Sequence, residues 1–131
     1  MVRILALFAL ALANPVSAKP LTVRMGETWL FAVRHGAPVA ARKVGSATAP
    51  APGQFKVSLQ PLLGSTMTIT NNSRFDYAYR ATLVLPDGKP GIAKSCAVPA
   101  NGKIAIEQWT RPIAAIRLDR FKRAPAGSLC P

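Results

Sequence analysis

The sequence has few acidic residues, one histidine and two cysteines. Its 131 residues contain 5 Asp and Glu against 17 Lys and Arg, which gives a formal net charge of +12. The single histidine, His35, stands in an expected turn, and no serine lies in a G-x-S-x-G nucleophile elbow. Because general acids, general bases and activated nucleophiles are scarce, the sequence predicts a protein that is not an enzyme and uses no cofactor.

The sequence also gives little support for a catalytic pair of carboxylates. Glycosidase chemistry needs two acids facing each other across a cleft. Asp76 and Glu107 each stand near the end of an expected strand, and nothing else in the sequence supports their meeting. Asp87 lies in a turn, where aspartate commonly bonds backbone groups. We therefore assign no catalytic residue and no metal ligand from the sequence.

Long apolar runs are also missing, since the longest covers residues 4–13 (ILALFALALA). Ten residues are too few for a helix that spans a bilayer core of ~30 Å. Arg3 precedes the run and Val16-Ser17-Ala18 follows it, which is typical of a secretory signal peptide cut after Ala18. The alternative is a permanent N-terminal anchor. We expect residues 1–18 to be removed and the mature chain, with no transmembrane segment, to be periplasmic or secreted.

The two cysteines, Cys96 and Cys130, both belong to the expected mature chain. An even count after a signal peptide indicates a disulfide bond. The closed loop of about 35 residues would stabilise the fold by roughly 3–4 kcal/mol in the chain-entropy model. An intermolecular bridge or a metal–thiolate pair is the alternative, although two thiols without a nearby histidine make a poor zinc site.

The mature chain, residues 19–131, is long enough for one domain and carries 16 bases against five acids, a net charge of +11. Both signs are scattered along it. Such a protein is drawn to polyanions, so we expect an anionic surface or an acidic protein of the cell envelope as its partner. Specific nucleic-acid binding is not expected, because the sequence has no recognition motif and its aromatic residues occupy inward phases.

Alternation with a period of two runs through the mature chain, and Pro, Gly and Asn residues interrupt it at short intervals. This pattern predicts an all-β fold, a small antiparallel β-sandwich of immunoglobulin-like type with seven or eight strands; a small β-barrel is the alternative. Asn101-Gly102 is a strong hairpin signal. The expected core side chains are Val23, Trp29, Phe31, Phe55, Val57, Leu59, Ile69, Tyr77, Tyr79, Leu83, Ile104, Ile106, Ile116 and Leu118.

The strongest concentration of charge lies near the C-terminus. Arg120 and Lys122 share one face of an extended chain there, and Arg117 shares the other with Arg123, while Phe121 falls out of phase and indicates a bulge or the end of the strand. One interpretation is an edge strand that charge protects from aggregation. The other is a binding strip for an anionic partner, made of Arg111, Arg117, Arg120, Lys122 and Arg123.

Two further functions remain open from the sequence. A rigid sandwich can inhibit an exported hydrolase by inserting a loop, and residues 45–53 and 86–91 are the candidate loops. A periplasmic copper carrier is the other, because thioether sulfur suits Cu(I), and Met25, Met67 and His35 are the available ligands. Both methionines are in phase with apolar neighbours, which favours a place in the core.

Residues 71–81 (NNSRFDYAYRA), Cys96 and residues 107–113 (EQWTRPI) resemble small exported bacterial proteins of uncharacterised function. The resemblance covers roughly residues 70–121. It implies an exported protein with a β-rich, Ig-like domain, and it brings no activity or site residue with it.

Overall fold

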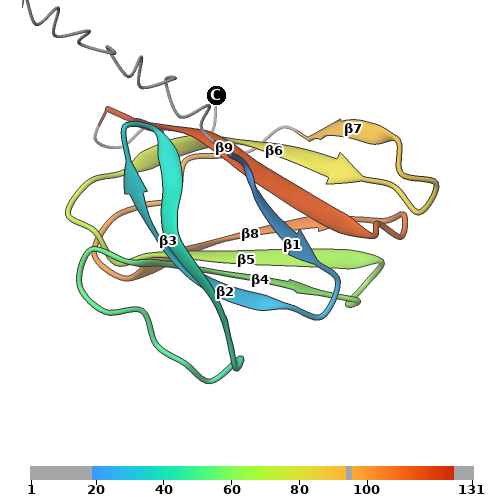
Figure 1. The fold of residues 1–131 in the computed structure, drawn as a ribbon, viewed down its shortest axis with the longest axis horizontal. Helices are drawn as coiled ribbons and strands as arrows, with labels where there is room; N and C mark the ends of the chain where they lie inside the picture. The colour runs from blue at the N-terminus through green and yellow to red at the C-terminus, as the bar shows by residue number, and fades with distance from the viewer. Residues whose placement is uncertain (1–18, 94–95, 126–131) are drawn as a thin grey trace, which may run out of the picture.

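The computed structural model describes residues 19–93 and 96–125, which form nine β-strands and no helix (Figure 1). No helix among these residues is therefore long and apolar enough to span a membrane. The nine strands exceed the seven or eight that the sequence predicted, and two of them have only four residues. The strands are β1 (Leu21–Arg24), β2 (Thr28–Arg34), β3 (Ala37–Val44), β4 (Phe55–Gln60), β5 (Ser65–Asn71), β6 (Tyr77–Val84), β7 (Pro90–Ala93), β8 (Lys103–Trp109) and β9 (Ala115–Arg123).

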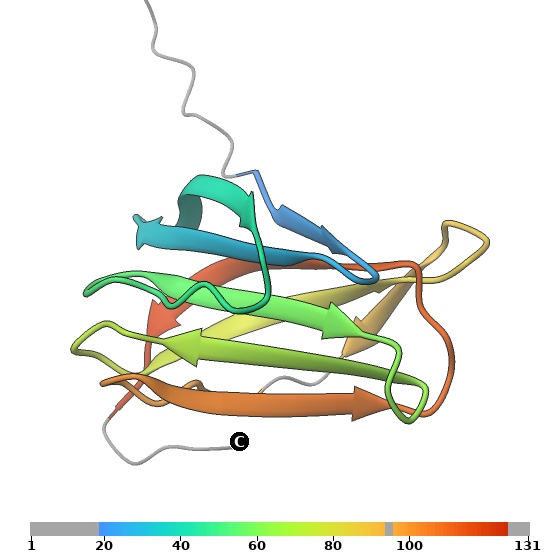
Figure 2. The ribbon, with the colours of Figure 1, turned by 90° about the horizontal axis from the view of Figure 1, so that it is seen from below.

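The strands form two antiparallel sheets that pack face to face. The four-stranded sheet has the order β1-β9-β6-β7, and the five-stranded sheet has the order β3-β2-β4-β5-β8, which can be followed in Figure 2. The sheets do not close into a barrel. The predicted antiparallel β-sandwich is therefore confirmed, and the barrel alternative is wrong.

The core lies between the sheets and follows the predicted alternation. In β4, Phe55, Val57 and Leu59 are buried, while Lys56 and Ser58 between them are half-buried. Burial of such apolar side chains is the main force that holds the two sheets together. Trp29 and Tyr77 are partly buried and pack against this cluster.

Strand β9 contains the bulge that the sequence indicated. The register with β6 shifts between Ala78 and Arg80, and Arg120 takes a positive φ of 51° at this point. The extra residue returns Phe121 to the inner face, where its side chain is only 4% exposed. Its ring packs against those of Phe31, Phe55 and Tyr79, with centroids 5.5–5.7 Å apart.

Two of the expected core residues, Ile104 and Ile106, are instead 53% and 56% exposed. They pair with Thr70 and Thr68 of β5, on the outer face of the five-stranded sheet. Alternation shows which side chains of a strand share a face, but not which face is turned inward. In β8 the inward positions belong to the intervening residues, Glu107 among them, and β8 is an edge strand.

The Asn101-Gly102 turn forms with both residues at positive φ, 64° and 80°, but it does not close a hairpin. The strand before it, β7, belongs to one sheet and β8 belongs to the other. The turn is bonded instead to the chain around the end of β5, since the Asn101 and Gly102 N–H groups donate to the Ser73 and Asn71 carbonyls. The hairpin signal was therefore right about the local turn and wrong about the pairing.

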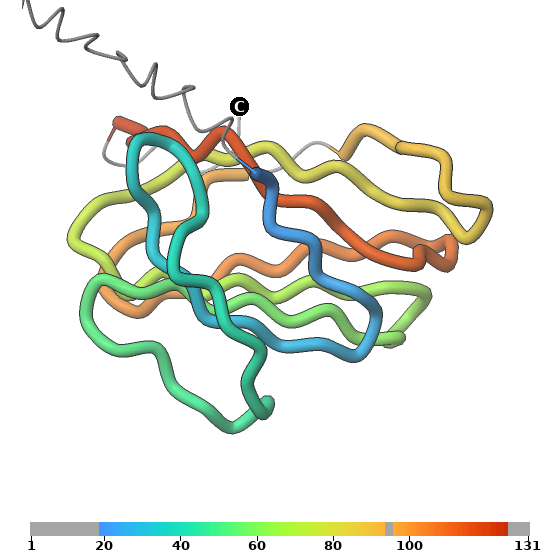
Figure 3. The backbone as a smooth tube through the Cα atoms, in the orientation of Figure 1, coloured from blue at the N-terminus to red at the C-terminus, as the bar shows by residue number. Residues whose placement is uncertain are grey.

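The two ends of the sandwich carry different connections, as the backbone trace in Figure 3 shows. One end, here called the cavity end, gathers the β2–β3 turn, the chain between β5 and β6, the turn before β8 and the end of β9. The opposite end holds the β4–β5 and β6–β7 turns and the connection from β8 to β9.

Candidate functional site

All five acidic residues of the chain are bound to groups within the fold. Three of them hold backbone segments in place. The carboxylates of Asp76, Asp87 and Glu107 accept hydrogen bonds from the N–H groups of Ala100, Lys89 and Cys96, at 2.8, 2.9 and 3.0 Å. Asp76 and Glu107 therefore both bond main-chain N–H groups of the connection between β7 and β8.

The other two acids form the two ion pairs present in residues 19–93 and 96–125. Asp119 binds the Arg80 guanidinium through both oxygens, with Nε to Oδ1 at 2.9 Å, and this contact raises the pKa of Arg80. Glu27 lies 3.5 Å from the Lys43 ammonium, and the Arg24 N–H that it accepts is the main cause of its lowered pKa. The remaining Lys and Arg side chains in these ranges have no carboxylate partner.

The five cations of the predicted strip do not form one strip. Strand β9 is not an edge strand, because it lies between β1 and β6, so the edge-protection interpretation is wrong. The bulge at Arg120 also changes the phase, and Arg117 and Lys122 share the outer face. Arg123 falls in the inner phase and lies at the cavity end, while Arg111 belongs to the opposite end, beside Gly91.

The outer face of the four-stranded sheet carries more cations than the sequence indicated. Arg24 of β1 and Arg80 of β6 lie there with Arg117 and Lys122. A hollow of about 410 Å³ runs over this face and is lined in part by Arg80, Arg117 and the 93%-exposed Ile92. Alternation within β1 and β6 could have found the two added arginines, but only with the knowledge that both strands flank β9.

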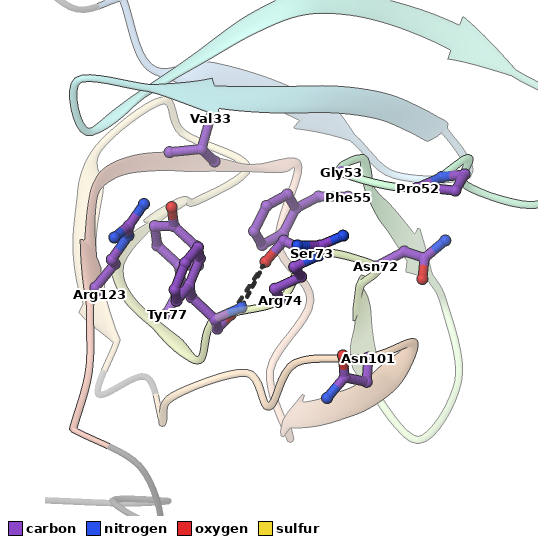
Figure 4. A pocket seen from close by; sticks show the side chains of 11 residues that line it. Val33, Pro52, Gly53, Phe55, Asn72, Ser73, Arg74, Tyr77, Asn101 and Arg123 are labelled. Atoms are coloured by element: carbon purple, nitrogen blue, oxygen red, sulfur yellow. Dashed lines mark hydrogen bonds between the residues drawn. The ribbon is translucent and has the colours of Figure 1, made fainter.

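The cavity end has a hollow of about 480 Å³, shown in Figure 4. The rings of Phe55 and Tyr77 lie edge to face there, with centroids 5.4 Å apart. A second hollow of about 400 Å³ adjoins the first, and both are lined by Arg74, Phe75, Asn101 and Arg123. Of these, only Arg123 was a candidate binding residue from the sequence, because the other residues come from turns that only the fold brings together.

The proposed copper ligands do not come together. Met25 precedes β2 and His35 follows it, so the full length of that strand, about 23 Å at 3.3 Å per residue, separates them. Met67 is fully buried in the core, as its phase predicted. The described residues contain no cluster of three or more His, Cys, Asp or Glu side chains that could hold a metal ion.

The two candidate inhibitory loops differ. Residues 45–53 are held down on their own domain, because the Lys56 ammonium donates to the Ser46 carbonyl and the Asn72 amide to the Pro50 carbonyl. Residues 86–90 are exposed, at the β6–β7 turn. Cys130 lies outside the described residues, as does the whole of residues 1–18, so the disulfide and the signal peptide stay predictions.

Glu107 is the one acid that faces the interior. Burial raises its pKa above the ordinary range, and hydrogen bonds from the Cys96 N–H and from Tyr79 partly offset this effect. Burial, and then the negative charge of Glu107, in turn raise the pKa of the Tyr79 hydroxyl. The neutral form of Glu107 is therefore favoured more in the folded chain than in the unfolded chain.

We expect Glu107→Gln to remove a pH dependence of stability. Since the pKa is raised on folding, the contribution of Glu107 is fully present below the carboxyl's ordinary pKa and is lost as the pH rises through the folded value. Urea unfolding between pH 4 and pH 8 should show the parent losing stability relative to the variant as pH rises. Asp87→Asn, in an exposed turn, is the control. If the free energy of unfolding of the parent minus that of the variant stays constant or grows as pH rises, the pKa of Glu107 is not raised on folding.

A comparison of the chain with protein-family models gives no match, and comparisons with curated proteins and with solved structures give no significant similarity. The fold therefore defines the class of the protein, a two-sheet antiparallel β-sandwich, and a fold of this kind does not by itself specify a function.

Proposed function

We propose that this protein is an exported, non-catalytic binding or accessory module that attaches to an anionic surface of the cell envelope. One observation carries the proposal: every Asp and Glu side chain is used inside the fold, while most lysines and arginines among residues 19–93 and 96–125 have no carboxylate partner. The positive charge is therefore not neutralised locally, and it acts on whatever lies outside the molecule.

The binding face in this proposal is the outer face of the four-stranded sheet. Arg24, Arg117 and Lys122 are exposed there and form no ion pair among the described residues. Thr22 and Thr82 flank Arg117 on the same face, and their short side chains leave the guanidinium free to reach a flat surface. Protein interfaces usually have an apolar, aromatic-rich centre, so this open cationic face favours a charged surface over an acidic protein.

Binding to phospholipid vesicles tests this function. The protein should bind vesicles with anionic headgroups at 0.05 M salt and release them as salt rises, because the Debye length falls to about 10 Å at 0.1 M. Vesicles of neutral phospholipid are the control and should bind weakly at every salt concentration. Binding that does not respond to salt, or equal binding to both vesicles, would rule out the electrostatic mechanism.

The face itself is tested by the double variant Arg117→Gln/Lys122→Gln. Each cation near an anionic membrane contributes about 1 kcal/mol, so we expect the double variant to bind roughly 30-fold more weakly at low salt. The matched control is Arg42→Gln/Lys103→Gln, which removes two exposed cations from β3 and β8 of the other sheet. An equal loss in both double variants would show that net charge, and not this face, determines binding.

A further inference from the structure

The hollow at the cavity end combines an apolar wall with two arginines. The half-buried Tyr77 supplies the accessible part of this wall, and the ring of Phe55, which is only 1% exposed, lies behind it. Figure 4 shows Arg123 on the left and Asn72 on the right of the hollow. Its volume of about 480 Å³ falls in the range of ordinary small-molecule pockets. Several loops far apart in sequence converge on it, so it is a product of the fold.

The charge in this hollow is positive and uncompensated. Arg74 and Arg123 line it, and no acidic residue does. The adjoining hollow does include Asp76, but that carboxylate accepts the Ala100 N–H at 2.8 Å. The Arg123 guanidinium lies 3.7 Å from the centre of the Phe75 ring. This stacking holds the group in one orientation and leaves its N–H edges available to a carboxylate.

Two amides complete the lining. Asn72 donates through Nδ2 to the Pro50 carbonyl, which fixes the side chain and leaves its Oδ1 as an acceptor. Asn101 is exposed, and its side chain makes no hydrogen bond among the described residues. Ser73 is different, because its hydroxyl is already bonded to Asn71 and Phe75. The hollow therefore offers amide groups that suit the hydroxyls of a ligand.

A ligand for this site needs a carboxylate, an apolar face and hydroxyl groups. A bare phosphate would leave the aromatic wall unused, and a fatty acid would leave the amides unpaired. We propose that the hollow binds one carboxylated sugar ring of the hexuronic acid class. Arg123 binds the carboxylate, Tyr77 packs against the C–H face of the ring, and Arg74, Asn72 and Asn101 bind its hydroxyls. This site is separate from the face that binds the envelope surface, and neither depends on the other.

Titration of the protein with sodium glucuronate, followed by calorimetry and by amide NMR shifts, tests the proposal. We expect saturable binding, with the largest shifts in residues 52–55, 72–77 and 101–102. Glucose has the same ring without the charge and should not bind at the same concentrations. Binding of glucose as strong as that of glucuronate, or no saturation by glucuronate, would overturn the proposal. Binding of a galacturonate oligomer alone, without the monosaccharide, would also overturn a single-ring site.

Variants separate this site from general attraction of anions. Arg74→Gln changes an exposed side chain, and the loss of a charged hydrogen bond should weaken glucuronate binding about tenfold or more. Arg42→Gln removes the same charge from β3, outside the hollow, and should leave the affinity unchanged. Arg117→Gln/Lys122→Gln should lower vesicle binding and leave glucuronate binding intact. Equal losses in the Arg74 and Arg42 variants would overturn the proposal, whatever the vesicle result.

Discussion

Phe121→Ala should destabilise the protein by about 3–5 kcal/mol, the range measured for aromatic-to-alanine changes in protein cores. The ring is buried and contacts three other aromatic rings, one from β2, one from β4 and one from β6. Its removal opens a cavity between the sheets where little can collapse into the space. The free energy of unfolding of a domain is only about 5–15 kcal/mol, so this substitution removes a large part of it. Urea unfolding measures the change.

Phe121→Leu is the matched control, because it keeps an apolar side chain at the same place. A smaller cost, about 1–2 kcal/mol, is expected from the imperfect fit. The main-chain bond from the Phe121 N–H to the Gly36 carbonyl, 2.9 Å long, is present in both variants. If alanine cost no more than leucine, the ring would not be packed between the sheets, and the bulge would not turn it inward.

Gly64→Ala should have the second largest effect on stability. Gly64 takes a φ of +93° in the β4–β5 turn, and an added Cβ would lie 2.3 Å from the Trp109 carbonyl oxygen and 2.7 Å from that of Thr110. Both neighbours are main-chain atoms, so the end of β8 must move. The unfavourable left-handed conformation and the overpacking together cost about 2–5 kcal/mol. Thermal unfolding of the purified variant measures this loss.

Gly88→Ala separates these two costs. Gly88 has a similar φ of +84° in the β6–β7 turn, but an added Cβ there would meet nothing within 4 Å. It should therefore show only the conformational cost, about 1–2 kcal/mol. Equal destabilisation in both variants would mean that β8 is not held close to the β4–β5 turn.

The fold was largely predictable from alternation, because the inward phase of β4 and β6 coincides with large apolar side chains. Strand β8 shows the limit of this reasoning. Its isoleucines alternate as a buried strand would, but it lies at an edge with Glu107 turned inward. The side chains of a single strand do not show which of its two faces is covered by the rest of the protein.

The candidate sites were less predictable. The sequence shows a dense group of cations near the C-terminus. Which of them share a face is decided by the one-residue β-bulge at Arg120. The hollow at the cavity end needed the fold, since Phe55 begins β4 while Arg74 and Asn101 belong to two separate connections. Contacts between turns so far apart depend on how the sheets pack.

The sequence by itself determined the surplus of positive charge, the expected export signal, the strand-forming alternation and the scarcity of catalytic groups. These are local or additive properties, and each can be obtained from residue identities and their spacing. The tertiary structure decided the pairing of β9 between β1 and β6, the use of the five Asp and Glu side chains within the fold and the assembly of the hollow. These features depend on contacts between distant segments, whose geometry is set by the packing of the whole domain.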